Sequence, residues 1–184
     1  MYETFEELEN GIQNCNKCKL CNNRTNIVLG VGNKDAKIMF IGEGPGADED
    51  IQGIPFVGKA GKLMNQAFKG IGIDREKVYI ANVVKCRPPM NRNPEQDEVS
   101  ACLDYLRSQV MLVKPEIIVL LGSVALKAIL GKEYSITASR GKWVERKGIK
   151  YMPTFHPAAL LRDESKKLDF WHDLKEVVRE ANKE

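Results

Sequence analysis

The sequence predicts a single-domain α/β protein, a three-layer α/β/α sandwich around a central, mostly parallel four-stranded sheet. The 184 residues suit one domain rather than two. Short apolar runs that end at a glycine or a polar residue are typical of buried strands. Segments with helical periodicity separate these runs, and such alternation indicates a parallel sheet covered by helices on both faces.

The first half of the chain supplies two of the expected strands. An amphipathic helix is predicted over residues 3–13, ahead of a compact apolar run at 37–42 that predicts the first strand. Residues 42–61 are rich in glycine and proline and predict a loop. A helix over residues 60–69 and a second apolar strand over 78–84 are expected to follow.

The second half repeats this alternation. The loop of residues 86–94 ends at Pro94, which suits the first turn of a helix that runs to about Val113. Residues 116–122 predict the third strand. The remaining expected elements are a short helix after Ser123, further strands over 142–146 and 149–155, and a charged amphipathic helix over 165–182.

Composition and charge limit the possible classes of protein. Apolar residues make up 43% of the chain and charged residues 29%, as in an ordinary globular domain. The net charge of +3 does not by itself indicate a polyanion-binding protein. No apolar run has the length of a transmembrane helix, and the acidic first residues lack the apolar core of a secretory signal. We therefore expect an intracellular protein.

Five cysteines, an odd number, favour metal ligands or free thiols over disulfides in a reducing compartment. Cys15 and Cys18 have C-x2-C spacing, and Cys86 and Cys102 form a wider pair. Four thiolates suit either tetrahedral zinc or an iron–sulfur cluster, and the spacing does not separate the two. Alternatively, Cys86 and Cys102 are buried apolar side chains. Cys21 is expected to be a bystander.

Three loops are candidates for the functional site, because ligands of such folds bind beyond the carboxyl ends of the strands. The glycine-rich residues 42–46 follow the first strand, and the Cys86 loop follows the second. Residues 155–162 follow the last extended segment. The basic side chains around the Cys86 loop are candidates for phosphate contacts, with a solvated surface as the alternative: Lys85, Arg87 and Arg92.

Three side chains in these regions suit ligand recognition. Asn82 interrupts an apolar strand, so it either ties down a neighbouring loop or recognises a ligand. Phe56 is a loop aromatic that either stacks on a base or fills the core. His156 precedes a proline and either donates a hydrogen bond to a developing anion or is purely structural.

Five motifs follow one another along nearly the whole chain. They are Cys15-x-x-Cys18; Gly42-Glu43-Gly44-Pro45-Gly46 with Glu49-Asp50; Gly53-Ile54-Pro55-Phe56-Val57-Gly58-x-Ala60-Gly61; the stretch from Asn82 to Pro94 followed by Cys102; and His156-Pro157-Ala158-Ala159-Leu160-Leu161-Arg162. In this order they resemble the family 4 uracil-DNA glycosylases, the iron–sulfur branch of the superfamily in bacteria and archaea.

The resemblance implies a DNA repair enzyme that flips uracil out of DNA and hydrolyses its N-glycosidic bond, leaving an abasic site. It implies a structural 4Fe–4S cluster, whose ligands map to Cys15, Cys18, Cys86 and Cys102. Cys21 has no counterpart in the pattern. The implied partner is single- or double-stranded uracil-containing DNA in a prokaryotic cytoplasm, at the nucleoid. A sliding clamp or another repair protein is a further candidate partner, no membrane is expected, and we expect a monomer.

The resemblance also implies roles for individual residues. Phe56 would stack on the flipped uracil, and the Asn82 amide would recognise its N3–H and O4 edge. His156 would donate to uracil O2 as the bond breaks, with the backbone around Glu43 and Gly44 close to the same oxygen. The residues expected to touch DNA are Arg92, Leu160 or Leu161 as a wedge in the base stack, and Arg162.

Two positions depart from the better-known branch of the superfamily. That branch has an aspartate where this chain has Gly44 and a tyrosine where it has Gly46, so the usual water-orienting carboxylate is missing. Glu43 and Glu49 are candidates to hold the water or the sugar cation, although Glu49 could instead bond Asn91 and fix the loop. The tyrosine excludes the thymine methyl, and the sequence does not show what does so here.

Three rival functions remain at this stage. The first is a protein that captures uracil-DNA covalently and releases no product, but the loop from Pro88 to Pro94 lacks the inserted basic segment and histidine of such relatives. The second is a cluster-bearing partner of a polymerase or clamp that has lost catalysis. The third is a related enzyme that acts mainly on other deaminated bases, such as hypoxanthine.

Overall fold

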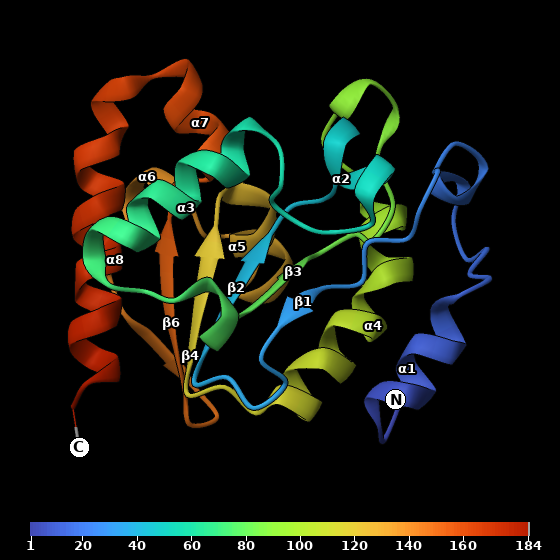
Figure 1. Ribbon diagram of the computed structural model, residues 1–184, viewed down its shortest axis with the longest axis horizontal. Coiled ribbons are helices and arrows are strands. Elements are labelled where there is room, and N and C mark those ends of the chain that lie inside the picture. The colour runs from blue at the N-terminus through green and yellow to red at the C-terminus, as the bar shows by residue number, and fades with distance from the viewer. Residues whose placement is uncertain (184) are drawn as a thin grey trace.

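Six strands form the sheet at the centre of the computed structural model, which describes residues 1–183 (Figure 1). The strand order is β1-β3-β2-β4-β6-β5, and the four inner strands are parallel to one another. The strands are β1 (Val31–Gly32), β2 (Ile38–Gly42), β3 (Tyr79–Asn82), β4 (Ile117–Leu121), β5 (Val144–Arg146) and β6 (Ile149–Thr154).

The predicted fold class is confirmed, and the sheet is wider than the expected four strands. Each edge carries one additional antiparallel strand, β1 beside β3 and β5 beside β6. β5 and β6 form a hairpin through Lys147 and Gly148, both with positive φ, as tight hairpin turns require. β1 is only two residues long, too short to produce a recognisable pattern in the sequence.

Helices cover both faces of the sheet, as Figure 1 shows. On one face of the sheet, Met39 and Ile41 of β2 pack with side chains of α1, α4 and α5. On the other face, the intervening residue Phe40 packs with side chains of α3, α7 and α8. This alternation makes β2 apolar on both faces. The helices described in residues 1–183 are α1 (Phe5–Ile12), α2 (Ala47–Gln52), α3 (Lys59–Ile71), α4 (Gln96–Val113), α5 (Ser123–Ile129), α6 (Ile136–Ser139), α7 (Pro157–Arg162) and α8 (Lys167–Ala181).

Two elements differ from the expectation. The loop predicted over residues 42–61 contains the short helix α2, whose acidic turn is not apolar enough to predict from periodicity. α4 begins at Gln96 rather than at Pro94, because the Glu98 carboxylate accepts a hydrogen bond from the Glu95 N–H and caps the helix there. No helix among residues 1–183 is both long and apolar enough to cross a bilayer.

Candidate active site

The predicted site loops all leave the sheet at the carboxyl ends of parallel strands. Gly42 at the end of β2 pairs in register with Asn82 at the end of β3. β6 ends at Thr154, and His156 follows two residues later as the N-cap of α7. Strands β2, β4 and β6 are neighbours in the sheet, so these loops meet along one edge.

Asn82 is a buried polar side chain with an unused acceptor. The residue is 1% exposed, and its Oδ1 atom has no hydrogen-bond partner. The backbone carbonyl of Asn82 accepts a hydrogen bond from the buried Lys85 ammonium at 2.7 Å, which fixes the end of the strand. A buried unpaired acceptor is costly in the free protein, and here Asn82 Oδ1 is free to accept a hydrogen bond.

The Phe56 ring lies close to the Asn82 side chain, next to Gly42. A Cβ atom on Gly42 would lie 2.5 Å from both Asn82 Oδ1 and Phe56 Cζ, so only glycine allows the strand end and the ring to approach so closely. Phe56 has a φ of 54°, a strained value for an aromatic residue. The Arg75 guanidinium stabilises this conformation by donating to the carbonyls of Pro55 and Phe56 at 2.6 and 3.0 Å.

His156, at the start of α7 after β6, contacts Phe56. Its ring lies against the Phe56 ring, with 5.5 Å between the centroids and 29° between the planes. Nδ1 accepts a hydrogen bond from the Ala158 N–H at 3.0 Å, so the proton of the neutral ring is on Nε2. Burial, reinforced by the positive charge of Arg162, lowers the pKa of His156 to about 4. The side chain is therefore a neutral N–H donor at physiological pH.

This shift predicts a pH-dependent stability. The unfolded chain binds a proton at His156 below about pH 6.5, whereas the folded chain does not until about pH 4. Folding is therefore disfavoured progressively as the pH falls through this window. We expect the free energy of unfolding of the wild type, relative to that of His156→Gln, to be lower at pH 5 than at pH 7. Denaturant titrations of both proteins at the two pH values measure it, and parallel pH dependences would contradict it.

The two candidate catalytic carboxylates lie in different surroundings. Burial raises the pKa of Glu43, and the charge of Arg162 opposes this shift. Glu49 instead accepts hydrogen bonds from three backbone N–H groups, of Gly46 at 3.2 Å, Val57 at 3.2 Å and Gly58 at 2.7 Å. We therefore assign Glu49 to fixing the loop around α2 rather than to catalysis.

The expected Glu49–Asn91 bond is wrong: both Glu49 carboxylate oxygens accept from backbone N–H groups, and the Asn91 side chain bonds Arg87 instead. The structure also shows why both departures from the better-known branch are glycines. A Cβ on Gly44 would lie 2.7 Å from Val84 Cγ2, and one on Gly46 would lie 2.8 Å from Glu49 Oε1. Larger residues there require a different packing of these two side chains.

Comparison with known proteins agrees with this geometry. The family model described as the uracil DNA glycosylase superfamily matches residues 29–175. A type-4 uracil-DNA glycosylase of Thermotoga maritima is 48% identical over 90% of this chain and 88% of its own length. One from Archaeoglobus fulgidus is 43% identical over 95% of this chain and 92% of its own. The chain belongs to the type-4 uracil-DNA glycosylases. A type-5 uracil-DNA glycosylase of Pyrobaculum aerophilum is 31% identical over 70% of this chain and 64% of its own.

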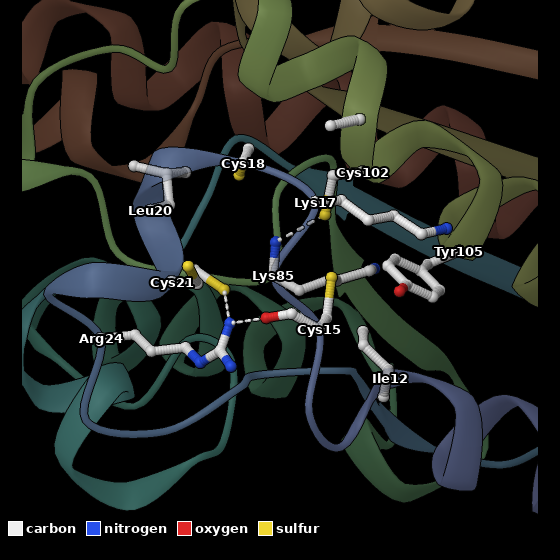
Figure 2. Close-up of a pocket in the computed structure, with 12 residues that line it drawn as sticks. Ile12, Cys15, Lys17, Cys18, Leu20, Cys21, Arg24, Lys85, Cys102 and Tyr105 are labelled. Carbon is white, nitrogen blue, oxygen red and sulfur yellow. Dashed lines mark hydrogen bonds between the residues drawn. The ribbon is translucent and has the colours of Figure 1, made fainter.

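A second site of this type-4 uracil-DNA glycosylase lies between the N-terminal segment, the Cys86 loop and α4. All five cysteines are free and line one pocket, and the close-up in Figure 2 labels Cys15, Cys18, Cys21 and Cys102 among its lining residues. The four predicted ligands supply the donor set that zinc and iron–sulfur centres use. Within residues 1–183, no group of three or more His, Cys, Asp or Glu side chains is arranged to hold a metal ion.

Two hydrogen bonds to sulfur provide donors that would stabilise thiolate ligands in this pocket. The Arg24 guanidinium donates to Cys86 Sγ at 3.5 Å and to the Cys15 carbonyl at 2.7 Å, and the Lys85 N–H donates to Cys102 Sγ at 3.3 Å (Figure 2). Burial raises the pKa of the Cys102 thiol to about 11, so binding of a metal there must displace protons.

The residues predicted to touch DNA separate into different environments. Leu160 is fully buried in the core with side chains of α3 and α8, so the prediction that it inserts into DNA is wrong. Leu161 is 47% exposed, and its insertion into the base stack stays a prediction. The Arg92 guanidinium donates to both oxygens of buried Glu98 at 2.7 and 3.1 Å, which anchors the loop before α4. DNA contacts of Arg92 and Arg162 stay predictions.

Several residues were missed or misplaced by the sequence analysis. Lys85 was a candidate for phosphate contacts but is fully buried, where its ammonium donates to Asn82 and to Gln109 Oε1 at 2.5 Å. Arg24 and Asp50 were not assigned roles. The Asp50 carboxylate accepts from the N–H groups of Thr25 and Asn26 and ties the cysteine segment to α2. The only sequence feature that pointed to this contact of Asp50 was its place in the acidic Glu49-Asp50 pair of a motif.

Proposed function

We propose that this protein is a monofunctional uracil-DNA glycosylase, which flips uracil out of DNA and hydrolyses the N-glycosidic bond. The products are free uracil and an abasic site, as in base-excision repair of deaminated cytosine. The observation that carries the proposal is the buried, unpartnered Oδ1 of Asn82 beside Phe56, in a chain of the type-4 family.

Base recognition follows from the hydrogen-bonding pattern of uracil. Asn82 Oδ1 accepts from uracil N3–H, and the amide nitrogen donates to O4. Cytosine has an acceptor at N3 and a donor at N4, so it places an acceptor against Asn82 Oδ1 and a donor against the amide nitrogen. This mismatch weakens binding of cytosine by roughly 1–3 kcal/mol. Phe56 stacks on the flipped base. Flipping costs about a few kcal/mol and is easier for a weakly paired G·U mismatch.

Bond cleavage depends on stabilising the departing uracil anion. His156, neutral and protonated on Nε2, donates to uracil O2 as negative charge develops there. We also place the backbone near Glu43 and Gly44, in the loop directly after β2, close to the same oxygen. The sugar then carries oxocarbenium character, and the Glu43 carboxylate is the remaining candidate to stabilise it or to hold the water.

We further propose a 4Fe–4S cluster bound by Cys15, Cys18, Cys86 and Cys102. When bound, the cluster supplies a covalent cross-link between the N-terminal segment, the Cys86 loop and α4. Lys85 stands between this site and the uracil pocket, because its N–H bonds Cys102 and its ammonium bonds Asn82. Cys102 and Lys85 would therefore connect a bound cluster to the strand end that carries Asn82.

Arg24 offers a specific test of this cluster. Its guanidinium donates to the Cys86 sulfur, which would carry negative charge as a cluster ligand, and hydrogen bonds to sulfur influence the potential and stability of a cluster. We expect Arg24→Gln to bind less iron per chain and to lose its visible absorption faster in air than the wild type. Arg107→Gln, an exposed change on α4 outside this pocket, is the control. Equal iron content and equal bleaching rates in both variants would refute this role.

The experiment that tests the function uses anaerobically purified protein and an end-labelled oligonucleotide with one uracil. We expect strand scission at that position after alkali, and none with a thymine control. Protein that binds the uracil strand without scission would favour the non-catalytic binding protein, and a protein–DNA adduct would favour covalent capture. Faster release of hypoxanthine than of uracil from matched strands would favour the other deaminated base as the main substrate.

The broader setting is also proposed. Residues 1–184 act as one uracil-DNA glycosylase domain, as a monomer, on single- or double-stranded uracil-containing DNA in the cytoplasm. A sliding clamp or other repair protein is a candidate partner. Size-exclusion chromatography with and without a uracil duplex tests the monomer and its complex.

A further inference from the structure

The loop between β3 and α4 has an apolar tip that the site described above does not use. Met90 is 93% exposed, the most exposed of the large apolar side chains described in residues 1–183. Met90 and Asn91 have φ values of 53° and 54°, in the left-handed region, which asparagine tolerates but which is strained for methionine. The chain therefore holds Met90 outward at a conformational cost.

Hydrogen bonds brace this tip on both sides. Arg87 Nε donates to Asn91 Oδ1 at 2.8 Å across the loop. The Arg92 guanidinium binds the fully buried Glu98 carboxylate, which anchors the loop to the first turn of α4. Strain that is held by surrounding contacts is typical of preorganised functional segments. The tip is thus set in place before any ligand arrives.

The tip also lies at the end of the sheet where the proposed uracil site is located. Its loop starts after Asn82 at the carboxyl end of β3, and Pro88 Cδ lies 3.8 Å from the position of a Cβ on Gly44. Leu161 belongs to α7, which follows β6. In the strand order β3-β2-β4-β6, the two loops flank the uracil pocket from opposite sides, and Figure 1 shows them apart at the same end of the sheet.

We propose that Met90 is a second DNA-contacting residue, which packs against the bases beside the flipped uracil on the side opposite Leu161. This inference rests on the proposed function. Apolar side chains that enter a base stack stabilise the distorted duplex, and a preorganised tip loses little entropy on binding. Arg87 at the base of the loop adds positive charge close to the phosphates. The contact stabilises the flipped state of duplex DNA.

The test compares Met90→Ala with Met111→Ala, which removes another exposed methionine, from α4. We expect Met90→Ala to slow single-turnover excision from duplex DNA about tenfold, with a much smaller effect on the single strand and an unchanged melting temperature. A 2-aminopurine beside the uracil is expected to brighten less on binding this variant. Met111→Ala is expected to behave as the wild type in each assay.

Equal behaviour of the two variants on duplex DNA would overturn the inference. A loss of the same size on single strands would also overturn it, because the contact would then not concern the opened stack. If the wild type released uracil from neither substrate, the proposed function would fail. The duplex affinity and the 2-aminopurine signal of the two variants would still decide whether Met90 touches the bases.

Discussion

Replacing His156 by alanine is expected to slow uracil excision by about 10²–10³-fold, the loss typical of one donor to a developing anion. His156 is neutral, and its Nδ1 accepts from the Ala158 N–H. The Nε2 proton is therefore the one available for donation to the substrate. The loss should fall on the single-turnover rate at saturating enzyme rather than on DNA affinity, because the donor strengthens only as the bond breaks.

The matched control for His156→Ala is His172→Ala, the other histidine, which lies on α8. It is expected to retain the wild-type rate. Single-turnover rates with a uracil duplex, together with affinities for a non-cleavable duplex, separate catalysis from binding. A loss below about threefold for His156→Ala, or an equal loss for both variants, would show that this histidine is structural.

Replacing Asn82 by leucine is expected to reduce activity and to stabilise the free protein. Leucine has nearly the shape of asparagine but accepts no hydrogen bond, so uracil N3–H loses its partner and the excision rate falls by at least about 10²-fold. The same change removes a buried acceptor that has no partner, a defect that costs about 1–3 kcal/mol. We expect the free energy of unfolding to rise by about 1 kcal/mol.

The control for Asn82→Leu is Asn26→Leu. The Asn26 side-chain amide donates to the carbonyls of Asp50 and Ile51 at 2.8 and 3.0 Å, so its loss should lower the free energy of unfolding. Denaturant unfolding of both variants and of the wild type gives the comparison. If Asn82→Leu unfolded more easily than the wild type, Asn82 would be a structural residue rather than one that awaits a ligand.

Secondary structure was predictable where one local property decided it. Residues 38–41 and 117–121 are apolar throughout because β2 and β4 are covered on both faces. Helix α8 carries the expected amphipathic pattern and lies within the predicted residues 165–182. The edge strand β5 lies within the predicted residues 142–146. β1 was missed, because a strand of two residues depends on pairing with a neighbour rather than on its own residues.

The site was predictable in its membership and less so in its roles. Asn82 and His156 stood out because each is a polar residue at the carboxyl end of an apolar segment, and β2, β3 and β6 bring them to one edge. Glu49 was assigned to catalysis or to Asn91, and the folded loop offers it three backbone N–H groups instead. Such donors are identical at every position in a sequence, so only the loop conformation selects them.

The sequence by itself determined the α/β class, the type-4 family and the residues of the proposed uracil site and cysteine site. Only the tertiary structure decided between Leu160, which is buried, and Leu161, which is exposed, because adjacent helical residues of one type differ only in the direction they face. It also placed Lys85 inside the protein and Met90 at a strained outer tip. Burial is a property of the packed chain and not of the residue, so a lysine with buried acceptors is interior and a methionine on a braced loop is not.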